Sequence, residues 1–464
     1  MTESSETLRE PDGRFPKGIV KGVAIMAIAA LLSVWLYVAL PYEDSANKGL
    51  ALLLFIAILW LTEAIHITVT ALLIPVVALA IGIPDLTTKK AFETFADPII
   101  FLFFGGFALA TALHVQKLDR KIAMRLISLS GSNLAIATLA IFGVTAFLSM
   151  WISNTATAAM MLPLALGMLT QMDKEKDRNT FVFILLGIAY SASIGGLGTL
   201  VGSPPNAIAA RALDMDFAGW MKIGLPMVLV LLPLMLLAMF IVLRPNLNRK
   251  IEVEIEDIPW TPLRITAMLI FAGTALAWIF SVKIASLLDI TAPDSWIAVA
   301  AAIAVVVSGA ANWRQVSDNT EWGVLFLFGG GLTLSALLQS SGASLVLGQQ
   351  VAQTFGGAHP FIVILVVAIF INVLTEFTSN TASAALLVPV FAAIATEMGM
   401  PVQVMVLVIG IGASCAFMLP VATPPNAIVF GTGFIKQREM ISVGAVLNVF
   451  CIALITLWAY FFLM

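Results

Sequence analysis

Charged side chains are scarce in this chain of 464 residues: 24 are Lys or Arg and 27 are Asp or Glu, which together make 11% of the sequence. A soluble domain carries about 25%. Hydrophobic residues make up 60% of the chain, and its mean hydropathy is +1.02. This composition excludes a soluble globular protein. A net charge of -3 also gives no basic surface of the kind that nucleic-acid binding requires, so no nucleic-acid partner is expected.

Cysteine and histidine are nearly absent as well. The two cysteines, Cys415 and Cys451, lie in apolar segments, and the three histidines are scattered along the chain. So few ligands build neither a disulfide framework nor a haem or transition-metal site. No nucleophile-base pair or nucleotide-binding loop lies in or near the apolar segments, so an enzyme is not expected.

Long apolar runs recur from residue 18 to the C-terminus, and a membrane-spanning helix needs about 20 apolar residues. The chain is therefore expected to be an all-α polytopic membrane protein. Charge clusters, prolines and glycines divide it into eleven candidate spans, near 18–40, 49–66, 67–84, 97–117, 181–211, 217–243, 262–282, 293–310, 322–340, 402–432 and 440–463.

Two further apolar stretches, 134–172 and 358–397, are each interrupted in the middle by a polar Ser-Asn-Thr. Each is either a hairpin or a pair of full spans. Both alternatives return the chain to the side it came from, so the topology of the remaining chain does not depend on the choice.

The distribution of basic residues predicts the orientation in the membrane. With the N-terminus in the cytoplasm, eighteen Lys and Arg side chains fall inside and six outside. Because cytoplasmic loops carry an excess of Lys and Arg, this count predicts a cytoplasmic tail over 1–17 and, with eleven crossings, a C-terminus outside. The lack of large loops suggests a bacterial inner membrane.

The chain repeats itself. SNTATAAMMLP returns as SNTASAALLVP with seven identities in eleven, FLFFGGFALATAL resembles LFLFGGGLTLSAL, and GSPPNAI resembles ATPPNAI. The three pairs occur in the same order, at 153–163 and 379–389, 101–113 and 325–337, and 202–208 and 422–428. Composition bias alone does not produce matching polar triplets, so we interpret the pattern as a duplication.

The predicted halves cover 18–243, which includes a preceding helix, and 262–463. Without the preceding helix, each half contains five of the eleven spans, an odd number of crossings, so the second half enters the membrane in the opposite sense. Such inverted-topology repeats are typical of secondary transporters. Aquaporin-type channels also use inverted halves, so a channel remains an alternative at this point.

The Ser-Asn-Thr triplets lie in runs without charge, where an unpaired polar group costs several kcal/mol. They must therefore face protein, water or a ligand. Ser and Asn favour helix caps, so a new helix is expected to begin at Thr155 and at Thr381. Two such helix starts would direct free N–H groups and positive dipole ends at one space, which favours an anion without any cationic side chain.

Glycines and consecutive prolines are expected to unwind the spans at 196–206 and 418–426, within predicted broken helices at 181–211 and 402–432. Unwinding frees backbone carbonyls such as those of Gly202 and Ala422, which suit a small alkali cation. The expected cargo is thus an anion carried together with cations. Asn206 and Asn426, just past the prolines, are better read as caps that hold the broken ends together.

Three polar residues within or beside apolar segments leave two interpretations open. Glu376 precedes the second triplet, and its counterpart in the first half is Met150. It either tunes the second site electrostatically or is a buried partner for an arginine or the backbone. Glu63 and His66, at a span junction, form either a proton relay or, in the favoured interpretation, an interfacial anchor.

These motifs, the eleven spans and the inverted repeat resemble the divalent anion:sodium symporters, which include the sodium/dicarboxylate cotransporters, over nearly the whole chain. The resemblance implies a homodimer whose transport domains move by an elevator-like displacement against fixed scaffold domains. It also implies that the stretches 134–172 and 358–397 are re-entrant hairpins with the Ser-Asn-Thr triplets at their tips.

The resemblance implies two sodium sites and one substrate site. It places the first sodium at Ser149, Ser153, Asn154 and Gly202, and the second at Thr375, Asn380 and Ala422. It places the substrate at Asn154, Thr155, Ser203, Asn380, Thr381, Thr423 and Pro424. Each asparagine would then serve both cation and substrate, which gives a physical route for coupling.

The leading hypothesis is a sodium-coupled symporter of C4-dicarboxylates such as succinate, malate and fumarate. The alternatives within the same fold are a citrate carrier, a sulfate carrier and a sodium-independent dicarboxylate exchanger. Such substrate differences are set by a few side chains, so the sequence does not decide among them.

Overall fold

The computed structural model describes residues 17–128, 133–250, 258–355 and 357–464. In these ranges all regular elements are helices, and the sole strand-like pairing is one bridge between Asn133 and Lys250. The all-α class predicted from the apolar runs is confirmed. The predicted tail over 1–17 lies outside the described residues except for Lys17, which begins the first helix.

The first part of the chain forms eleven α-helices and two short 3-10 helices. They are α1 (Lys17–Ala39), α2 (Asp44–Thr62), α3 (Ile67–Ala80), α4 (Thr88–Glu93), η1 (Thr94–Ala96), α5 (Pro98–Val115), α6 (Leu118–Ser128), α7 (Leu134–Ser149), α8 (Asn154–Leu169), α9 (Arg178–Gly195), η2 (Gly196–Gly198), α10 (Pro204–Ala212) and α11 (Phe217–Leu243).

The second part repeats the order that begins at α2, with one extra short helix, α13, and without a counterpart of α1. Its helices are α12 (Pro262–Ile279), α13 (Ser281–Leu288), α14 (Pro293–Val307), α15 (Trp313–Asn319), α16 (Trp322–Ser340), α17 (Ala343–Phe355), α18 (Pro360–Thr375), α19 (Asn380–Glu397), α20 (Val402–Gly412), α21 (Pro424–Phe430) and α22 (Gln437–Phe462). The match extends to detail, because α7 and α18 both have 16 residues and both start behind a side-chain cap, from Asn133 and His359.

Nine helices in the described ranges are long and apolar enough to cross a membrane, or up to eleven if each of two sharply bent helix pairs counts as one span. This set overlaps with the eleven predicted spans but is not identical to it. Helix α19, one arm of a predicted hairpin, is long enough to cross, whereas α3 and α20 are shorter than the spans predicted at 67–84 and 402–432. The chain is a multi-pass membrane protein.

Helix boundaries differ from the predicted spans where a polar residue stabilises a helix end. The span expected at 49–66 is α2, which begins at Asp44, an acid in the first turn that complements the helix dipole. It ends at Thr62, and Glu63 follows in the left-handed region with φ 46°. His66 then caps α3 by accepting a hydrogen bond from the N–H of Thr68. The amphipathic helices α6 and α17 were not predicted.

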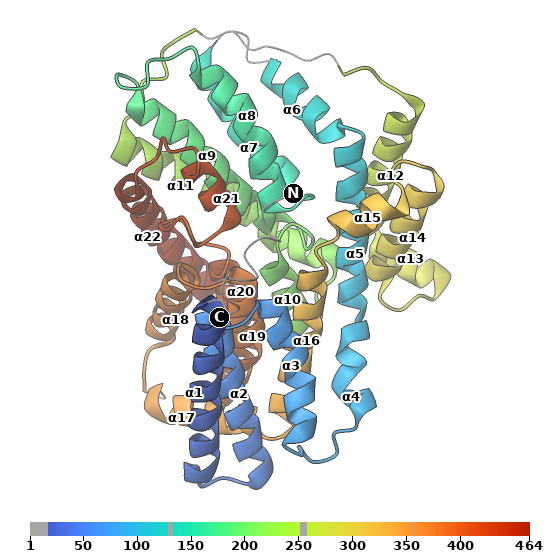
Figure 1. Cartoon of the computed structure of the whole chain (residues 1–464), viewed down its shortest axis with the longest axis vertical. Coiled ribbons are helices and arrows are strands. Elements are labelled where there is room, and N and C mark those ends of the chain that lie inside the picture. The colour runs from blue at the N-terminus through green and yellow to red at the C-terminus, as the bar shows by residue number, and fades with distance from the viewer. Residues whose placement is uncertain (1–16, 129–132, 251–257, 356) are drawn as a thin grey trace.

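The two halves interlock through their short helices. Helix α21 of the second half packs against α8 and α9 of the first, and α10 of the first half packs against α19 and α20 of the second. Helix α5 packs against α14, and α16 packs against α3. Figure 1 shows α5 and α12–α14 along one side of the molecule and α9, α11 and α22 along the other. The helix breaks lie between these two sides.

Close helix packing at two of these contacts depends on glycine. A Cβ at Gly105 of α5 would lie 2.4 Å from the carbonyl oxygen of Ala298 in α14. A Cβ at Gly195 of α9 would lie 2.2 Å from the carbonyl oxygen of Ala146 in α7. Both distances are far below van der Waals contact, so a side chain at either position would separate the helices.

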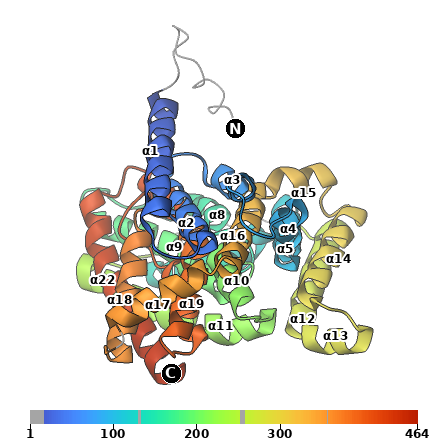
Figure 2. The same ribbon diagram turned by 90° about the horizontal axis from the view of Figure 1, so that it is seen from below.

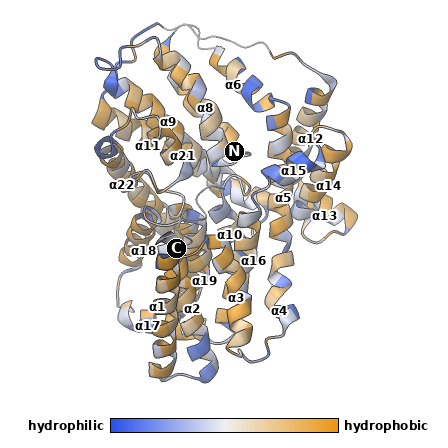
Figure 3. Cartoon of the chain, in the orientation of Figure 1, coloured by the Kyte–Doolittle hydropathy of each residue, from blue (hydrophilic) through white to orange (hydrophobic). Residues whose placement is uncertain are grey.

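Hydrophobic residues predominate along most helices, and polar residues gather on α15, parts of α6 and the connections at the ends (Figure 3). Helix α1 stands at the edge of the molecule, and the view in Figure 2 shows its N-terminal end projecting away from the other helices. Only 17% of its span is buried inside the protein. This exposure is expected of a helix surrounded by lipid.

Candidate functional site

The first Ser-Asn-Thr triplet lies at the break between α7 and α8. Helix α7 ends at Ser149, and α8 begins at Asn154. Ser153 is the N-cap, and its hydroxyl accepts a hydrogen bond of 3.3 Å from the N–H of Ala156. The helix was expected to begin at Thr155 and in fact begins one residue earlier, because the serine rather than the asparagine takes the capping position.

The second triplet has the same local structure. Helix α18 ends at Thr375, Ser379 is the N-cap of α19, and its hydroxyl accepts from the N–H of Ala382 at 3.4 Å. Helix α19 begins at Asn380 rather than at the expected Thr381. Both triplets thus place an asparagine in the first turn of a new helix, at the positive end of its dipole.

Behind each asparagine, a buried hydroxyl bridges the break to the next helix. Ser149 Oγ lies 2.6 Å from the side-chain amide of Asn154 and donates to the carbonyl oxygen of Ala192 at 2.7 Å. Thr375 donates to Asn380 Oδ1 at 2.7 Å and to the carbonyl oxygen of Ala413 at 2.7 Å. These two networks are equivalent by repeat, so Ser149 and Thr375 hold corresponding positions.

The amide of Asn154 faces a cluster of oxygen atoms. When the amide is turned by 180°, its nitrogen donates to Ser149 Oγ at 2.6 Å, to the Ala192 carbonyl at 3.1 Å and to the Gly202 carbonyl at 3.3 Å. One hydroxyl oxygen and two backbone carbonyl oxygens therefore converge on the amide, and neutral oxygens of this kind are suitable ligands for an alkali cation.

The consecutive prolines lie at helix starts rather than inside a helix. Helix α10 begins at Pro204 and α21 at Pro424, where a missing N–H is harmless and a fixed φ favours the first turn. The preceding segments, from Thr199 to Ser203 and from Ala413 to Thr423, contain no helix. The expected unwinding at Gly202 and Ala422 is therefore present, and the prolines restart the helix after it.

Asn206 and Asn426 connect the two pieces of each broken helix, as the cap interpretation requires. Asn206 Nδ2 donates to the carbonyls of Gly196 and Thr199, both at 2.7 Å. Asn426 Nδ2 donates to the corresponding carbonyls of Ala416 and Leu419, at 3.3 and 3.0 Å.

The triplets and breaks of both halves line one cavity of about 450 Å³. All seven residues expected to bind substrate line it, namely Asn154, Thr155, Ser203, Asn380, Thr381, Thr423 and Pro424. Ser153, Gly202 and Ala422 of the expected sodium sites line it as well. Ser149 and Thr375 do not, because they are fully buried behind the asparagines. Glu63, which follows α2, and residues of α3, α5 and α16 form most of the remaining wall.

No Lys, Arg or His lines this cavity in the described chain. Positive potential comes from the first turns of α8 and α19, because the N-terminus of each helix is equivalent to about half a unit positive charge. Two acids, Glu63 and Glu321, also line the cavity. Glu321 immediately precedes α16, and it was not identified from the sequence as a cavity residue. The signal that could have identified it is its position just before 325–337, the apolar run that matches 101–113.

Glu376 is bound by backbone donors, which is the second of the two roles considered for it. Its carboxylate accepts from the N–H groups of Phe417, Met418 and Leu419 at 2.7–3.0 Å, and from Asn448 Nδ2 at 2.8 Å. These three N–H groups belong to the unwound segment between α20 and α21. Glu376 therefore fixes the tip that carries Asn380 to the second helix break and to α22.

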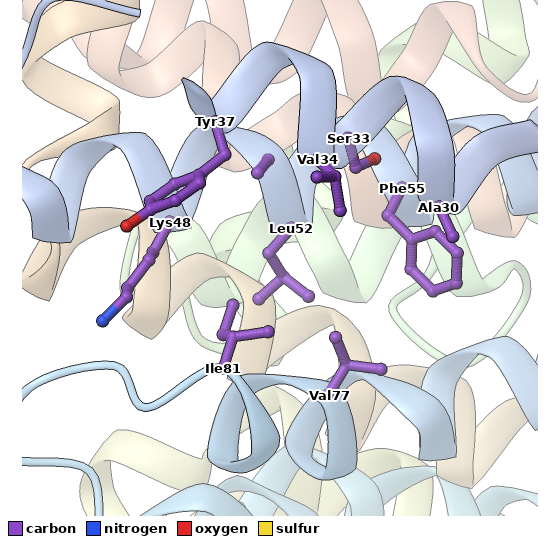
Figure 4. A pocket seen from close by; sticks show the side chains of 10 residues that line it. Ala30, Ser33, Val34, Tyr37, Lys48, Leu52, Phe55, Val77 and Ile81 are labelled. Atoms are coloured by element: carbon purple, nitrogen blue, oxygen red, sulfur yellow. The ribbon is translucent and has the colours of Figure 1, made fainter. Parts of the chain in front are cut away.

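A second cavity of about 450 Å³ lies between α1, α2 and α3 (Figure 4). Apolar side chains such as Leu52, Phe55 and Val77 dominate its lining, and Tyr37 and Lys48 lie at one end. Lys48 pairs with Asp44 at 2.8 Å and donates to the carbonyl of Gly82. With its one cation already paired and few polar groups, this cavity is unsuited to a multiply charged anion.

The sequence matches a family model described as citrate transporter over residues 57–412. It is 55% identical to an uncharacterized transporter of Haemophilus influenzae, with 96% of this chain and 97% of that protein covered. It is 34% identical to the sodium-dependent dicarboxylate transporter SdcS of Staphylococcus saprophyticus, with 96% and 90% covered, and 34% identical to that of Staphylococcus aureus, with 90% and 87% covered.

Two solved structures share the fold at low sequence identity. The YdaH transporter of Alcanivorax borkumensis superimposes with a TM-score of 0.59 at 15% identity, over 96% of this chain and 99% of that chain. MtrF of Neisseria gonorrhoeae superimposes with a TM-score of 0.52 at 14% identity, over 96% of each chain. At these identities the likeness concerns the arrangement of helices alone.

Proposed function

Because the chain belongs to the divalent anion:sodium symporter family, we propose that it is a sodium-coupled symporter of C4-dicarboxylates such as succinate, malate and fumarate. One observation carries the proposal: both triplets and both helix breaks line a single cavity that contains no Lys, Arg or His. Such a cavity attracts an anion with helix ends and carbonyl-rich clusters, and it needs accompanying cations to neutralise a dianion. The relatives named sodium-dependent dicarboxylate transporters support the same pairing of ions.

The first sodium site is proposed at Ser149, Ser153, Asn154 and Gly202, where oxygen atoms surround the amide of Asn154. The second is proposed at Thr375, Asn380 and Ala422, where Thr375 repeats the bridging hydrogen bonds of Ser149. Neutral oxygen ligands suit sodium, a small hard cation. Sodium is transported with the substrate in this proposal and is not a resident cofactor.

The substrate is proposed to lie between the two tips. One carboxylate meets Asn154 and Thr155, and the other meets Asn380 and Thr381, with Ser203, Thr423 and Pro424 along the sides. Each asparagine contributes to a sodium site and to the substrate site, so a bound sodium ion fixes the amide that the carboxylate contacts. Without sodium, the dianion would face only helix dipoles, which are too weak to neutralise two charges.

Transport is proposed to follow an elevator-like movement within a homodimer. The interlocked set of α8, α10, α19 and α21 carries both tips and both breaks, so these elements are suited to move as one body. The elements α2, α3, α5 and α16 form the facing wall and are assigned to the fixed scaffold. In this proposal, the stretches 134–172 and 358–397 enter the membrane from opposite sides as re-entrant hairpins.

The orientation is proposed as N-terminus in the cytoplasm and C-terminus outside, in the inner membrane of a bacterium. Single cysteines at Met1 and Met464, in a chain whose buried Cys415 and Cys451 are replaced by alanine, report this directly. A membrane-impermeant thiol reagent should label residue 464 in intact cells and residue 1 only after permeabilisation. Labelling of both positions from the same side would show that the number of crossings is even.

Uptake of labelled succinate into proteoliposomes tests the function. An inward sodium gradient should drive accumulation above the external concentration, and replacing sodium by potassium or choline should abolish it. Uptake that ignores sodium but rises with internal dicarboxylate would make the protein an exchanger and remove the sodium sites. Flux that neither saturates nor concentrates succinate would make it a channel.

Citrate is the second candidate substrate, because the matching family model is described as citrate transporter. The cavity volume does not exclude it, since about 450 Å³ lies within the usual range for small-molecule sites. Sulfate, a smaller anion with two charges, is the third candidate. Labelled citrate and sulfate therefore belong in the same uptake experiment.

A further inference from the structure

The lining of the cavity contains both positive and negative groups. The first turns of α8 and α19 contribute positive potential. The lining also includes two carboxylates, Glu63 after α2 and Glu321 before α16, together with apolar residues such as Ile67 and Val324. Both acids are exposed to the cavity, and no ion pair in the described ranges involves either of them.

Local structure holds the two acids on the same wall. Glu63 follows the last residue of α2 in a left-handed conformation. Trp60 Nε1 donates to the Ile67 carbonyl at 3.1 Å, which fixes the turn from α2 to α3. Thr68 then donates to the Gly323 carbonyl at 3.3 Å, which joins the start of α3 to the start of α16, next to Glu321.

Glu321 does not cap its helix, unlike the corresponding acid of the first half. Asp97, which immediately precedes α5, caps that helix by accepting from the N–H of Ile99 at 3.0 Å. It is also paired with Arg211 at 3.1 Å. Glu321 makes no capping hydrogen bond to α16, and the described chain offers it no cationic partner. Its carboxylate interacts with the hydroxyl of Ser153, at the tip of the first triplet.

We propose that Glu321 and Glu63 determine substrate charge, so that the cavity accepts C4-dicarboxylates and rejects tricarboxylates. This inference rests on the proposed function. A C4-dicarboxylate places its two carboxylates at the two tips and its central carbons against the facing wall. A tricarboxylate of the citrate type carries its third carboxylate on the central carbon, so that group points at the two acids.

Repulsion decides the choice because size does not. A cavity of about 450 Å³ accommodates the larger anion. Specificity against a similar ligand is often obtained by placing a like charge where only the unwanted ligand carries one. Both acids are exposed to water, which screens them, so we expect a discrimination of about tenfold for each rather than an absolute barrier.

The test is competition between citrate and labelled succinate in proteoliposomes at alkaline pH, where citrate carries three charges. In Glu321→Gln, the ratio of citrate Ki to succinate KM should fall by about tenfold, and in the Glu321→Gln/Glu63→Gln double variant it should fall further. Asp318→Asn is the matched control. It removes an acid three residues from Glu321 that is paired with Arg314 and does not line the cavity, so the ratio should stay within about twofold.

A second readout separates charge from shape. Near neutral pH, part of the citrate is protonated to a dianion of unchanged size. Citrate should therefore compete better at neutral than at alkaline pH with the unmodified protein, and this pH dependence should flatten in the double variant. A wall that excludes citrate sterically would give no pH dependence in either protein.

Three results would overturn the proposal. The first is that the unmodified protein takes up succinate with sodium but citrate competes equally well. The second is that the double variant leaves the Ki/KM ratio unchanged. In either case Glu321 and Glu63 do not determine substrate charge, while the proposed symport function is unaffected. The third is that the unmodified protein takes up no dicarboxylate in the presence of a sodium gradient. The proposed function is then wrong, and so is the role of the two acids that rests on it.

Discussion

Replacing Asn154 with alanine is expected to weaken sodium binding and dicarboxylate binding together, each by about 100-fold. The amide contacts the Ser149 hydroxyl and the Gly202 carbonyl of the first proposed sodium site and also lines the cavity. A hydrogen bond or ligand contact to a charged group contributes about 1.5–3 kcal/mol, and each 1.4 kcal/mol corresponds to about tenfold in affinity. Asn380→Ala should behave alike, because Asn380 contacts the Thr375 hydroxyl and lines the same cavity.

The measurement is succinate binding to the purified protein as a function of sodium concentration, for each variant and for the pair. Thr157→Val is the matched control, because Thr157 lies on α8 three residues from Asn154, is fully buried and does not line the cavity. It should leave both affinities within about twofold of the unmodified protein, since it alters no ligand. If Asn154→Ala changes only one of the two affinities, the asparagine does not couple the ions.

The positions of the triplets and breaks could be predicted because polar residues in apolar runs are conspicuous. Asn154 and Asn380 lie in stretches without charge, where each polar group must have a partner. The paired motifs then predicted which residues occupy equivalent positions, and the equivalent hydrogen bonds of Ser149 and Thr375 agree with that pairing. The cavity unites all seven predicted substrate residues, although their role remains a prediction.

Contacts between distant segments could not be predicted in the same way. Glu321 lines the cavity because α16 begins beside α3. The residues around Glu321 in the sequence do not indicate that α3 is a neighbour. Helix starts were misplaced by one residue at Asn154 and Asn380, because the sequence does not specify which of two adjacent polar residues takes the cap. The sequence also gave no way to separate short helices such as α3 and α20 from full spans.

The sequence predicts that Glu376 must have hydrogen-bond partners, but it does not identify them. A carboxylate in an apolar stretch must be paired, and a helix broken by the later Pro-Pro-Asn must leave N–H groups without partners. These two requirements are complementary, so the pairing was accessible in principle. The partners themselves, Phe417 to Leu419, lie about forty residues away in apolar sequence and have side chains that carry no signal.

Replacing Glu376 with leucine is expected to destabilise the protein by about 4 kcal/mol or more. The change removes the acceptor of four buried donors, the N–H groups of residues 417–419 and the Asn448 amide. Each unsatisfied buried donor costs about 1–3 kcal/mol. Glu376→Gln should be intermediate, because its amide oxygen still accepts while its amide nitrogen faces donors. The melting temperature of the detergent-purified protein gives this order directly.

The same variants should also affect sodium, which a purely structural role would not explain. Glu376 lies beside Thr375 of the second proposed sodium site, and its negative charge favours a nearby cation. The first half has no such charge, because the counterpart of Glu376 is Met150. There the hydroxyl of Thr199 donates to the backbone carbonyl of Met150, so neutral groups connect the tip of the first triplet to the first helix break.

Glu376→Gln should therefore raise the sodium concentration needed for half-maximal uptake by about tenfold, even at a temperature where the variant is fully folded. Thr199→Val, the matched change in the first half, should lower the melting temperature. It also removes the acceptor for the N–H of Gly202 in the first proposed sodium site, so a shift in the sodium dependence is expected, but one well below the shift of Glu376→Gln. If the two variants shift sodium dependence equally, the charge of Glu376 has no electrostatic role, and the two sodium sites differ only in how the chain around them is held.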